Sequence, residues 1–227
     1  MNVQDRRLIM TADGSHSISL PDLNITFHSR HGAIQESKHV FIEAGYRKIM
    51  ERFPLQPINI LEVGLGTGLN AFLTAIACME NDQLIRYTGL ETHPLDMATS
   101  ANLNYPEQLG HVDLFDSIQL ATWNSPVSIH NTFSIRKQST NLLEYEGTDP
   151  FHLIYFDAFA PDVQPQLWTE FVFQSLARNT LPGGMLVTYC SKGSVRRAME
   201  AAGWKVEKLQ GPKGKREMVR ASIPVAM

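Results

Sequence analysis

Short apolar runs that alternate with helix-like stretches constrain the fold of this chain more than any other feature. The runs read INILEVG, IRYTGLE, FHLIYFDAF and GGMLVTYC. Apolar residues recur at helical spacing in the stretches 69–78, 168–179 and 194–202. Apolar strands that alternate with helices are typical of a parallel sheet covered on both faces. The pattern therefore predicts an α/β protein of the doubly wound class.

The C-terminal segment distinguishes two versions of this fold. A helix that ends at Gly203 is followed by WKVEKLQ and KREMVRASI, with a short connection between them that contains glycine and proline. This connection is too short for a crossover helix, so the two strands should pair antiparallel. Such an ending is typical of the Rossmann-like methyltransferase fold rather than of a dehydrogenase. We expect a seven-stranded, mostly parallel sheet with an antiparallel last strand.

The N-terminal segment differs from the rest of the chain. The sequences HSISL and ITFHS flank a PDLN turn, which predicts a β-hairpin. Apolar residues then recur at helical spacing over 36–53. A chain of 227 residues with 43% hydrophobic residues can bury one substantial core. We expect a hairpin and helix extension over 1–52 and one compact methyltransferase domain over 53–227.

Composition limits the partners and the compartment. The net charge of −3 gives no general attraction to nucleic acid, so a polyanion would need a local basic patch. Cys78 and Cys190 lie in apolar segments, which favours free thiols in a reducing cytosol over a disulfide. Neither a signal peptide nor a long apolar run is present, which predicts a cytoplasmic protein that does not bind membranes. The histidines at 16, 28, 31 and 39 have no metal-like arrangement, and we expect no metal.

The sequence LEVGLGTGLN, residues 61–70, predicts a strand, a glycine turn and a helix. In a doubly wound sheet this turn lies where ligands bind, and its glycines allow a ligand to approach the backbone. The candidate contacts in this turn are Gly64, Gly66, Thr67, Gly68 and Asn70. The turn lacks both the GxGxxG pattern of dinucleotide sites and the Lys-Ser/Thr of a phosphate loop.

Acidic residues near this turn favour a cationic ligand that contains a ribose. Glu62 would repel a pyrophosphate but suit the sulfonium and ammonium of S-adenosyl-L-methionine. Glu91, at the end of IRYTGLE, is placed to accept both ribose hydroxyls, although a solvated strand-end glutamate is the alternative. Methyltransferases often have an acidic residue near the adenine after the next strand. This chain has Gln-Ser-Thr at 138–140, and Ser139 is the candidate contact.

Asp157 follows the buried run 153–156, at the expected rim of the pocket. The sequence FAPDVQP after it predicts a rigid, partly apolar loop. The carboxylate either caps the next turn or lies beside the reactive methyl group, where it acts in catalysis.

The stretches DAFAPDVQPQLW, LPGGMLVTYCSKGSVRRAMEAAGW and GPKGKREM closely resemble the methyltransferase domain of the bacterial tRNA 5-methylaminomethyl-2-thiouridine biosynthesis bifunctional proteins. GLGTGLN and FHSRHGAIQESKHVFI extend this resemblance over most of the chain. Ala158 and Gln164 stand where that family commonly has glycine and asparagine, and Gln-Ser-Thr replaces its Gly-Asp-Ala. The resemblance implies the fold of class I S-adenosylmethionine-dependent methyltransferases.

The implied reaction methylates the aminomethyl nitrogen of the wobble uridine in the anticodon region of tRNA. Family members carry a C-terminal FAD-dependent oxidase that exposes this amine. The present sequence ends at Met227, which predicts a methyltransferase without the oxidase and a separate enzyme that generates the aminomethyl uridine.

The chemistry of this reaction and the residue types suggest roles for Asp157, for its loop and for a basic cluster. Asp157 would orient the substrate ammonium and accept its proton. Phe159 and Pro161 would form a wall for the flipped uracil, and the loop cluster Lys213, Lys215 and Arg216 would bind tRNA.

Two other functions stay open from the sequence. One is a methyltransferase or aminopropyltransferase of similar fold that acts on a small amine. A polyamine site should have several acids, and only Asp157, with Asp162 nearby, is visible. The other is a methyltransferase-like scaffold without its cofactor, against which GLGTG, Glu91 and Asp157 argue.

Overall fold

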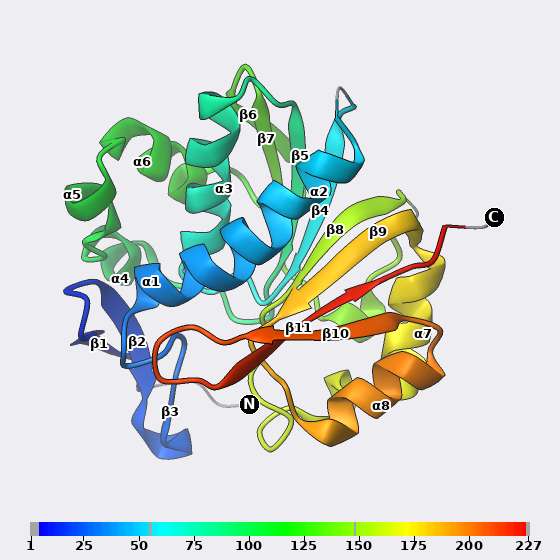
Figure 1. Cartoon of the computed structure of the whole chain (residues 1–227). Coiled ribbons are helices and arrows are strands. Elements are labelled where there is room, and N and C mark those ends of the chain that lie inside the picture. The colour runs from blue at the N-terminus through cyan, green and yellow to red at the C-terminus, as the bar shows by residue number, and fades with distance from the viewer. Residues whose placement is uncertain (1–4, 55, 148, 226–227) are drawn as a thin grey trace.

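The computed structural model describes residues 5–54, 56–147 and 149–225. Its main sheet has eight strands in the order β10-β11-β9-β8-β4-β5-β7-β6 (Figure 1). The strands are β4 (Ile58–Val63), β5 (Ile85–Leu90), β6 (Pro126–His130), β7 (Phe133–Gln138), β8 (Phe151–Phe156), β9 (Thr180–Thr188), β10 (Lys205–Gln210) and β11 (Glu217–Ser222). The central five strands are parallel, and β11 is antiparallel to both β9 and β10. The α/β fold and its antiparallel ending are therefore confirmed.

The sheet has eight strands rather than the seven expected. The additional strand, β6, pairs antiparallel with β7 at the edge of the sheet. Its alternation of exposed and half-buried residues carries little apolar signal, which is why the search for apolar runs did not detect it.

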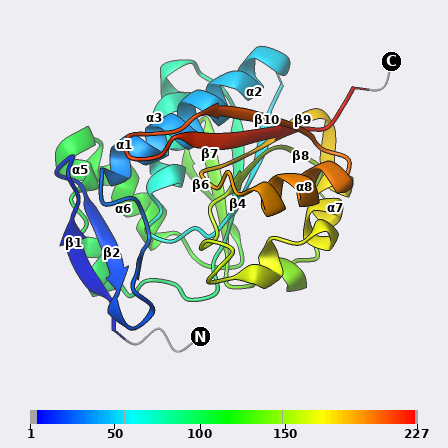
Figure 2. The same cartoon turned by 60° about the horizontal axis from the view of Figure 1, so that its bottom comes forward.

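Helices cover the sheet on both faces (Figures 1 and 2). On one face lies a helix in three segments, and α3 packs beside it. The segments are α1 (Ala33–Ser37), the π-helical η2 (Lys38–Tyr46) and α2 (Arg47–Arg52), and α3 is Leu69–Glu80. Gly45 allows η2 to lie close to the sheet, because a Cβ there would be 3.0 Å from Val187 Cγ2. The predicted helix over 36–53 is thus confirmed with slightly different ends.

The opposite face carries α7 (Glu170–Arg178) and α8 (Gly193–Ala201). Strand residues alternate between the two layers: Ile60 packs toward α3 and η2, and Leu61 packs toward α7. Both layers are apolar, so the central strands are buried on both faces. Cys78 and Cys190 are free and buried.

Two connections complete the main domain. Three short helices join β5 to β6: α4 (Met97–Ala101), α5 (Tyr105–Leu109) and α6 (Val112–Leu120). Between β7 and β8, the described residues contain only the 3₁₀ turn Leu142–Glu144. None of the helices described here is long and apolar enough to cross a membrane.

The N-terminal hairpin is part of a small antiparallel sheet of three strands. The predicted pair is β2 (His16–Leu20) with β3 (Ile25–Thr26), and β1 (Arg7–Met10) adds a strand that the sequence pattern did not predict. Ile18 and Leu20 belong to the same buried cluster as the α3 side of the main sheet. This small sheet therefore packs on the main domain, and the division at residue 52 remains a prediction.

Candidate active site

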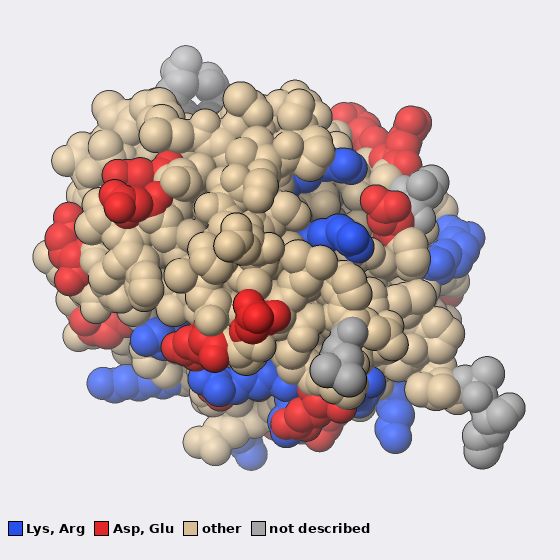
Figure 3. All heavy atoms as spheres, turned by 90° about the horizontal axis from the view of Figure 1, so that it is seen from above, with Lys and Arg blue, Asp and Glu red and all other residues tan. Residues whose placement is uncertain are grey.

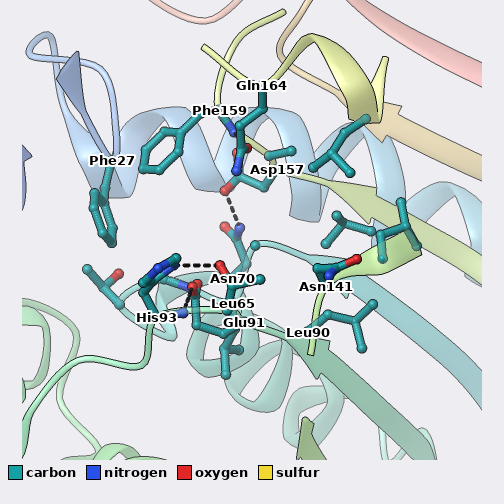
Figure 4. Close-up of a pocket in the computed structure, with 18 of the residues that line it drawn as sticks. Phe27, Leu65, Asn70, Leu90, Glu91, His93, Asn141, Asp157, Phe159 and Gln164 are labelled. Carbon is teal, nitrogen blue, oxygen red and sulfur yellow. Dashed lines mark hydrogen bonds between the residues drawn. The ribbon is translucent and has the colours of Figure 1, made fainter. Parts of the chain in front are cut away.

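A deep pocket lies at the carboxyl ends of β4, β5, β7 and β8 (Figure 4). Strand β4 is central: the chain continues from it to β5 on one side and later returns to β8 on its other side, so the strand order reverses here. Doubly wound sheets bind their ligands at this switch point. Half of the predicted site residues, seven of fourteen, line this pocket: Gly64, Gly66, Thr67, Asn70, Glu91, Asp157 and Phe159.

The glycine loop brings the backbone of β4 against that of β8. Gly64 has φ +91°, and a Cβ on it would lie 2.7 Å from the carbonyl oxygen of Asp157. Only glycine accommodates both this conformation and this contact. Gly66 and Gly68 also have positive φ, and Gly68 precedes the first residue of α3. Gly68 itself is not among the residues that line the pocket.

Glu91 is fixed at the end of β5 by backbone donors. The amide of Gly66 donates to Oε2 at 2.9 Å, and the amide of His93 donates to Oε1 at 2.8 Å (Figure 4). Each carboxylate oxygen keeps a lone pair for a further donor. The side chain is therefore held at the pocket with acceptors to spare, and its contact with a ribose stays a prediction.

Asn70 connects two carboxyl groups at the base of the pocket. Its Nδ2 donates to Asp157 Oδ2 at 2.9 Å and to Glu62 Oε1 at 2.8 Å. Glu62 is fully buried and also accepts a hydrogen bond from the hydroxyl of Tyr87 at 2.8 Å. Glu62 thus lies behind Asn70 rather than on the pocket surface, and it shapes the site through Asn70.

Burial changes the acidity of both carboxyl groups. It raises the pKa of Asp157 well above its usual value, with Glu36 adding to the rise and Asn70 and Lys215 opposing it. Burial and the nearby Asp157 likewise raise the pKa of Glu62. Asp157 is therefore easier to protonate than an ordinary aspartate.

Two aromatic residues form one wall of the pocket. Phe159 follows β8, and Phe27 comes from the segment after β3; their ring centroids lie 5.4 Å apart in an edge-to-face arrangement (Figure 4). Gln164 Oε1 accepts from the Phe159 amide at 2.8 Å, and Trp168 Nε1 donates to the Phe159 carbonyl at 2.8 Å. These contacts fix the loop after Asp157. Pro161 lies on this loop but does not line the pocket.

The opposite end of the pocket is built by the residues after β7. Ser139 is exposed and does not line the pocket; its amide donates to Asn124 Oδ1. The next residues, 140–143, line it instead, and Asn141 caps the turn that they form. Adenine contact by Ser139 therefore stays an untested prediction, and its neighbours present the available surface.

The predicted basic cluster lies outside the pocket. Lys213 and Arg216 are exposed on the β10–β11 loop. Lys215 turns inward, where its Nζ donates to Glu36 Oε1 at 2.6 Å. Figure 3 shows the molecule from the top of Figure 1, and on that face most Lys and Arg lie along the lower edge, with Asp and Glu beside them.

Sequence motifs did not identify several residues that line the pocket. Those from the N-terminal segment are Arg6, Leu20, Phe27 and His28, and those from later loops are residues 140–143, Gln164, Gln166 and Leu167. The resemblance of FHSRHGAIQESKHVFI, which begins at Phe27, was a signal for Phe27 and His28 only.

The pocket fits S-adenosyl-L-methionine in its polar groups. Gly64 and Gly66 line the pocket without side chains that would enter it, and Glu91 offers carboxylate acceptors at its rim. Asn70 Oδ1 is buried and has no hydrogen-bond partner, so an ammonium group of a ligand can donate to it. Within the described residues, no group of three or more His, Cys, Asp or Glu could hold a metal ion.

Comparisons with known proteins agree with this site. A family described as S-adenosyl-L-methionine-dependent methyltransferase matches residues 129–224. The tRNA 5-methylaminomethyl-2-thiouridine biosynthesis bifunctional protein MnmC of Nitrosospira multiformis is 30% identical in an alignment of 214 residues that covers 87% of this chain. The matched part is 34% of that relative, so the chain spans about a third of its length.

Two solved structures share the fold. MnmC2 from Aquifex aeolicus has a TM-score of 0.80 at 24% identity, covering 98% of this chain and 72% of the other. Spermidine synthase from Thermotoga maritima has a TM-score of 0.62 at 14% identity, and the match covers 100% of this chain and 72% of the synthase. At these identities the structures establish the fold only, and the sequence matches establish the family. The chain is an MnmC-like methyltransferase domain that depends on S-adenosyl-L-methionine.

Proposed function

We propose that this chain methylates the aminomethyl nitrogen of the wobble uridine in tRNA, giving methylaminomethyl-(2-thio)uridine. The observation that carries the proposal is the placement of Asp157 at the end of β8, where its carboxyl group lines the pocket beside the glycine loop. The name of the MnmC relative, a tRNA 5-methylaminomethyl-2-thiouridine biosynthesis protein, supports tRNA as the substrate.

An amine must lose its proton before its nitrogen can form a new bond, and Asp157 is suited to take that proton. A primary alkyl amine is mostly protonated at neutral pH, as the lysine pKa of about 10.4 indicates. Asn70 occupies Oδ2 of Asp157, and no described residue donates to Oδ1, which is left for the substrate ammonium. The raised pKa brings the carboxyl group closer to the working pH, where a general base is most effective.

The residues of the site also orient the reaction. When bound, S-adenosyl-L-methionine supplies a methyl group on a positively charged sulfur. Asp157, held by Asn70, would fix the position of the amine in the pocket, and such positioning contributes a large part of the rate in displacement reactions. The proton leaves the nitrogen for the Asp157 carboxylate, directly or through one water, and then passes to solvent.

The aromatic wall suits an unpaired base. Phe27 and Phe159 present apolar surface beside Asp157, and RNA-binding sites commonly stack unpaired bases on aromatic rings. Enzymes that modify a nucleobase take it out of its stack before they act on it. A uracil held here would place its aminomethyl group toward Asp157, and the exposed Lys213 and Arg216 would contact phosphates.

Methyl transfer to defined tRNA tests this proposal. The purified chain is incubated with cofactor labelled in the methyl group and with tRNA that carries aminomethyl uridine at the wobble position. The tRNA is then digested to nucleosides, and we expect label in methylaminomethyl uridine. Matched tRNA with unmodified wobble uridine and the Asp157→Asn variant are the controls. Label in another nucleoside, or none in tRNA, would refute the substrate assignment.

A small amine as the substrate is the main alternative. Glu91 and Asp157 are the only acids among the pocket-lining residues of the described chain, and both oxygens of Glu91 accept from backbone amides. Asp162 pairs with Lys192 outside the pocket. A polyamine, with several ammonium groups, would find few partners. Putrescine or a small primary amine in place of tRNA distinguishes the two, and calorimetry with the cofactor tests the inactive scaffold.

A further inference from the structure

Lys215 makes contacts that differ from those of an RNA-binding lysine. Its Nζ donates to Glu36 Oε1 at 2.6 Å and lies 4.0 Å from the centre of the Tyr189 ring. The Glu36 side chain is only 7% exposed, and that of Lys215 is 33% exposed. Neighbouring Lys213 and Arg216 are exposed. The sequence grouped these three residues, but the fold gives Lys215 a partner inside the protein.

Both members of this ion pair are connected to the walls of the pocket. Glu36 Oε2 accepts from the amide of Ser29 at 2.6 Å, two residues after Phe27. The Tyr189 hydroxyl donates to the carbonyl of Ala158 at 2.9 Å, one residue after Asp157. The pair therefore lies between the N-terminal wall and the loop that carries the carboxylate.

The charges of the pair act on Asp157 in opposite directions. Glu36 raises the pKa of Asp157 and Lys215 lowers it, and burial exceeds both effects. Removing one member leaves the other uncompensated near the carboxylate. The titratable groups coupled to Asp157 from the surrounding elements are Glu36, Glu62, Tyr87, Tyr189 and Lys215.

We propose that Glu36 and Lys215 are positioning residues that hold the Asp157 loop against the N-terminal wall and balance the charge around Asp157. This inference rests on the proposed role of Asp157 as proton acceptor. Lys215 then affects turnover and its pH dependence, whereas Lys213 and Arg216 affect tRNA binding.

The pH profile of kcat tests the pair, because its acid limb reports ionisation in the enzyme–substrate complex. Glu36→Gln keeps the shape and an acceptor for Ser29 but removes the negative charge. We expect its acid limb to move to lower pH by about one unit, the size typical of one neighbouring charge. Lys215→Met leaves Glu36 unpaired, and its acid limb should move by a similar amount to higher pH. The KM values should change less than twofold.

Conservative variants and a matched pair keep the test specific. Lys215→Arg keeps the charge, so its acid limb should stay at the wild-type position. Lys208 and Glu217 form an exposed ion pair of 2.8 Å on the same hairpin, and Lys208→Met and Glu217→Gln should leave the limb unchanged. Because Lys215→Met breaks a half-buried pair and can fail to fold, Glu36→Gln alone is sufficient to decide.

The outcomes separate this inference from the proposed function. The inference is refuted if the wild type methylates tRNA and the acid limb of Glu36→Gln lies within about 0.2 pH units of the wild-type limb. That difference is on the order of a tenth of the shift that a close charge can cause. A loss of kcat at every pH without a shift would refute the charge-balancing role and leave only a contact that holds the loop. If the wild type does not methylate tRNA at any pH, the proposed function itself fails.

Discussion

Replacement of Gly64 by alanine tests whether the glycine loop sets the position of Asp157. The backbone of Gly64 has φ +91°, which costs an alanine about 1–2 kcal/mol. The new Cβ would also lie 2.7 Å from the carbonyl oxygen of Asp157, a backbone atom that cannot rotate away. Such overpacking costs about 1–3 kcal/mol. We therefore expect the free energy of unfolding to fall by about 2–5 kcal/mol.

The same clash should impair the site, because it pushes Asp157 away from the loop. A displacement of 1 Å at a reacting centre can lower turnover about 100-fold. We expect this loss in kcat, and a cofactor affinity at least about tenfold weaker, or 1.4 kcal/mol. Denaturant unfolding, calorimetry and single-turnover methylation measure the three quantities.

Gly203 supplies the matched control, since its φ is +90° but no atom lies within 4 Å of a Cβ placed there. Gly203→Ala should show only the backbone cost, about 1–2 kcal/mol, with normal cofactor affinity. The difference between the two variants isolates the contact with Asp157. Equal unfolding energies and equal cofactor affinities in the two variants would refute the reasoning.

Three further predictions concern the charge, the wall and the tRNA contacts. Asp157→Asn should lower kcat about 10²–10⁴-fold in tRNA methylation. Folding raises the pKa of Asp157 above its unfolded value, so ionisation of this carboxyl group lowers the stability of the wild type as the pH rises. The variant should therefore melt at a higher temperature than the wild type at about pH 7–8. This difference should vanish below about pH 4, where the carboxyl group is protonated in both states. Phe159→Ala should weaken tRNA binding by about 1–3 kcal/mol with a smaller change in cofactor affinity, and equal losses in both would contradict a base-stacking wall. In tRNA-binding titrations, Lys213→Gln and Arg216→Gln should each reduce the slope of the logarithm of the binding constant against the logarithm of the salt concentration by about one. An unchanged slope would exclude phosphate contacts by these residues.

Local features of the sequence predicted most of the fold and the central residues of the site. The apolar runs became β4, β5, β8 and β9 because central strands that helices cover on both faces bury most of their residues. The glycine loop and Asp157 follow directly from the ends of such strands. Parallel strands end at the same edge of a sheet, so the residues that follow them meet in one pocket.

Only the tertiary structure decided which distant segments complete the pocket. Phe27 meets Phe159 because the small N-terminal sheet packs on the main domain, and no local period encodes that contact. The edge strand β6 lacks an apolar run, so its pairing with β7 could not be predicted from its own sequence.

The same limit applies to individual side chains. In the sequence, Lys215 has the same basic loop environment as Lys213, yet it pairs with Glu36, which lies 179 positions earlier in the chain. Glu62 precedes the glycine loop, but the pleat of β4 turns it into the core, where it reaches the pocket only through Asn70. The sequence by itself determined the central strands, the glycine turn and the helices with a clear apolar period, because periodicity and turn residues act locally. Folding decided which charges are neutralised inside the protein, because that depends on which surfaces meet.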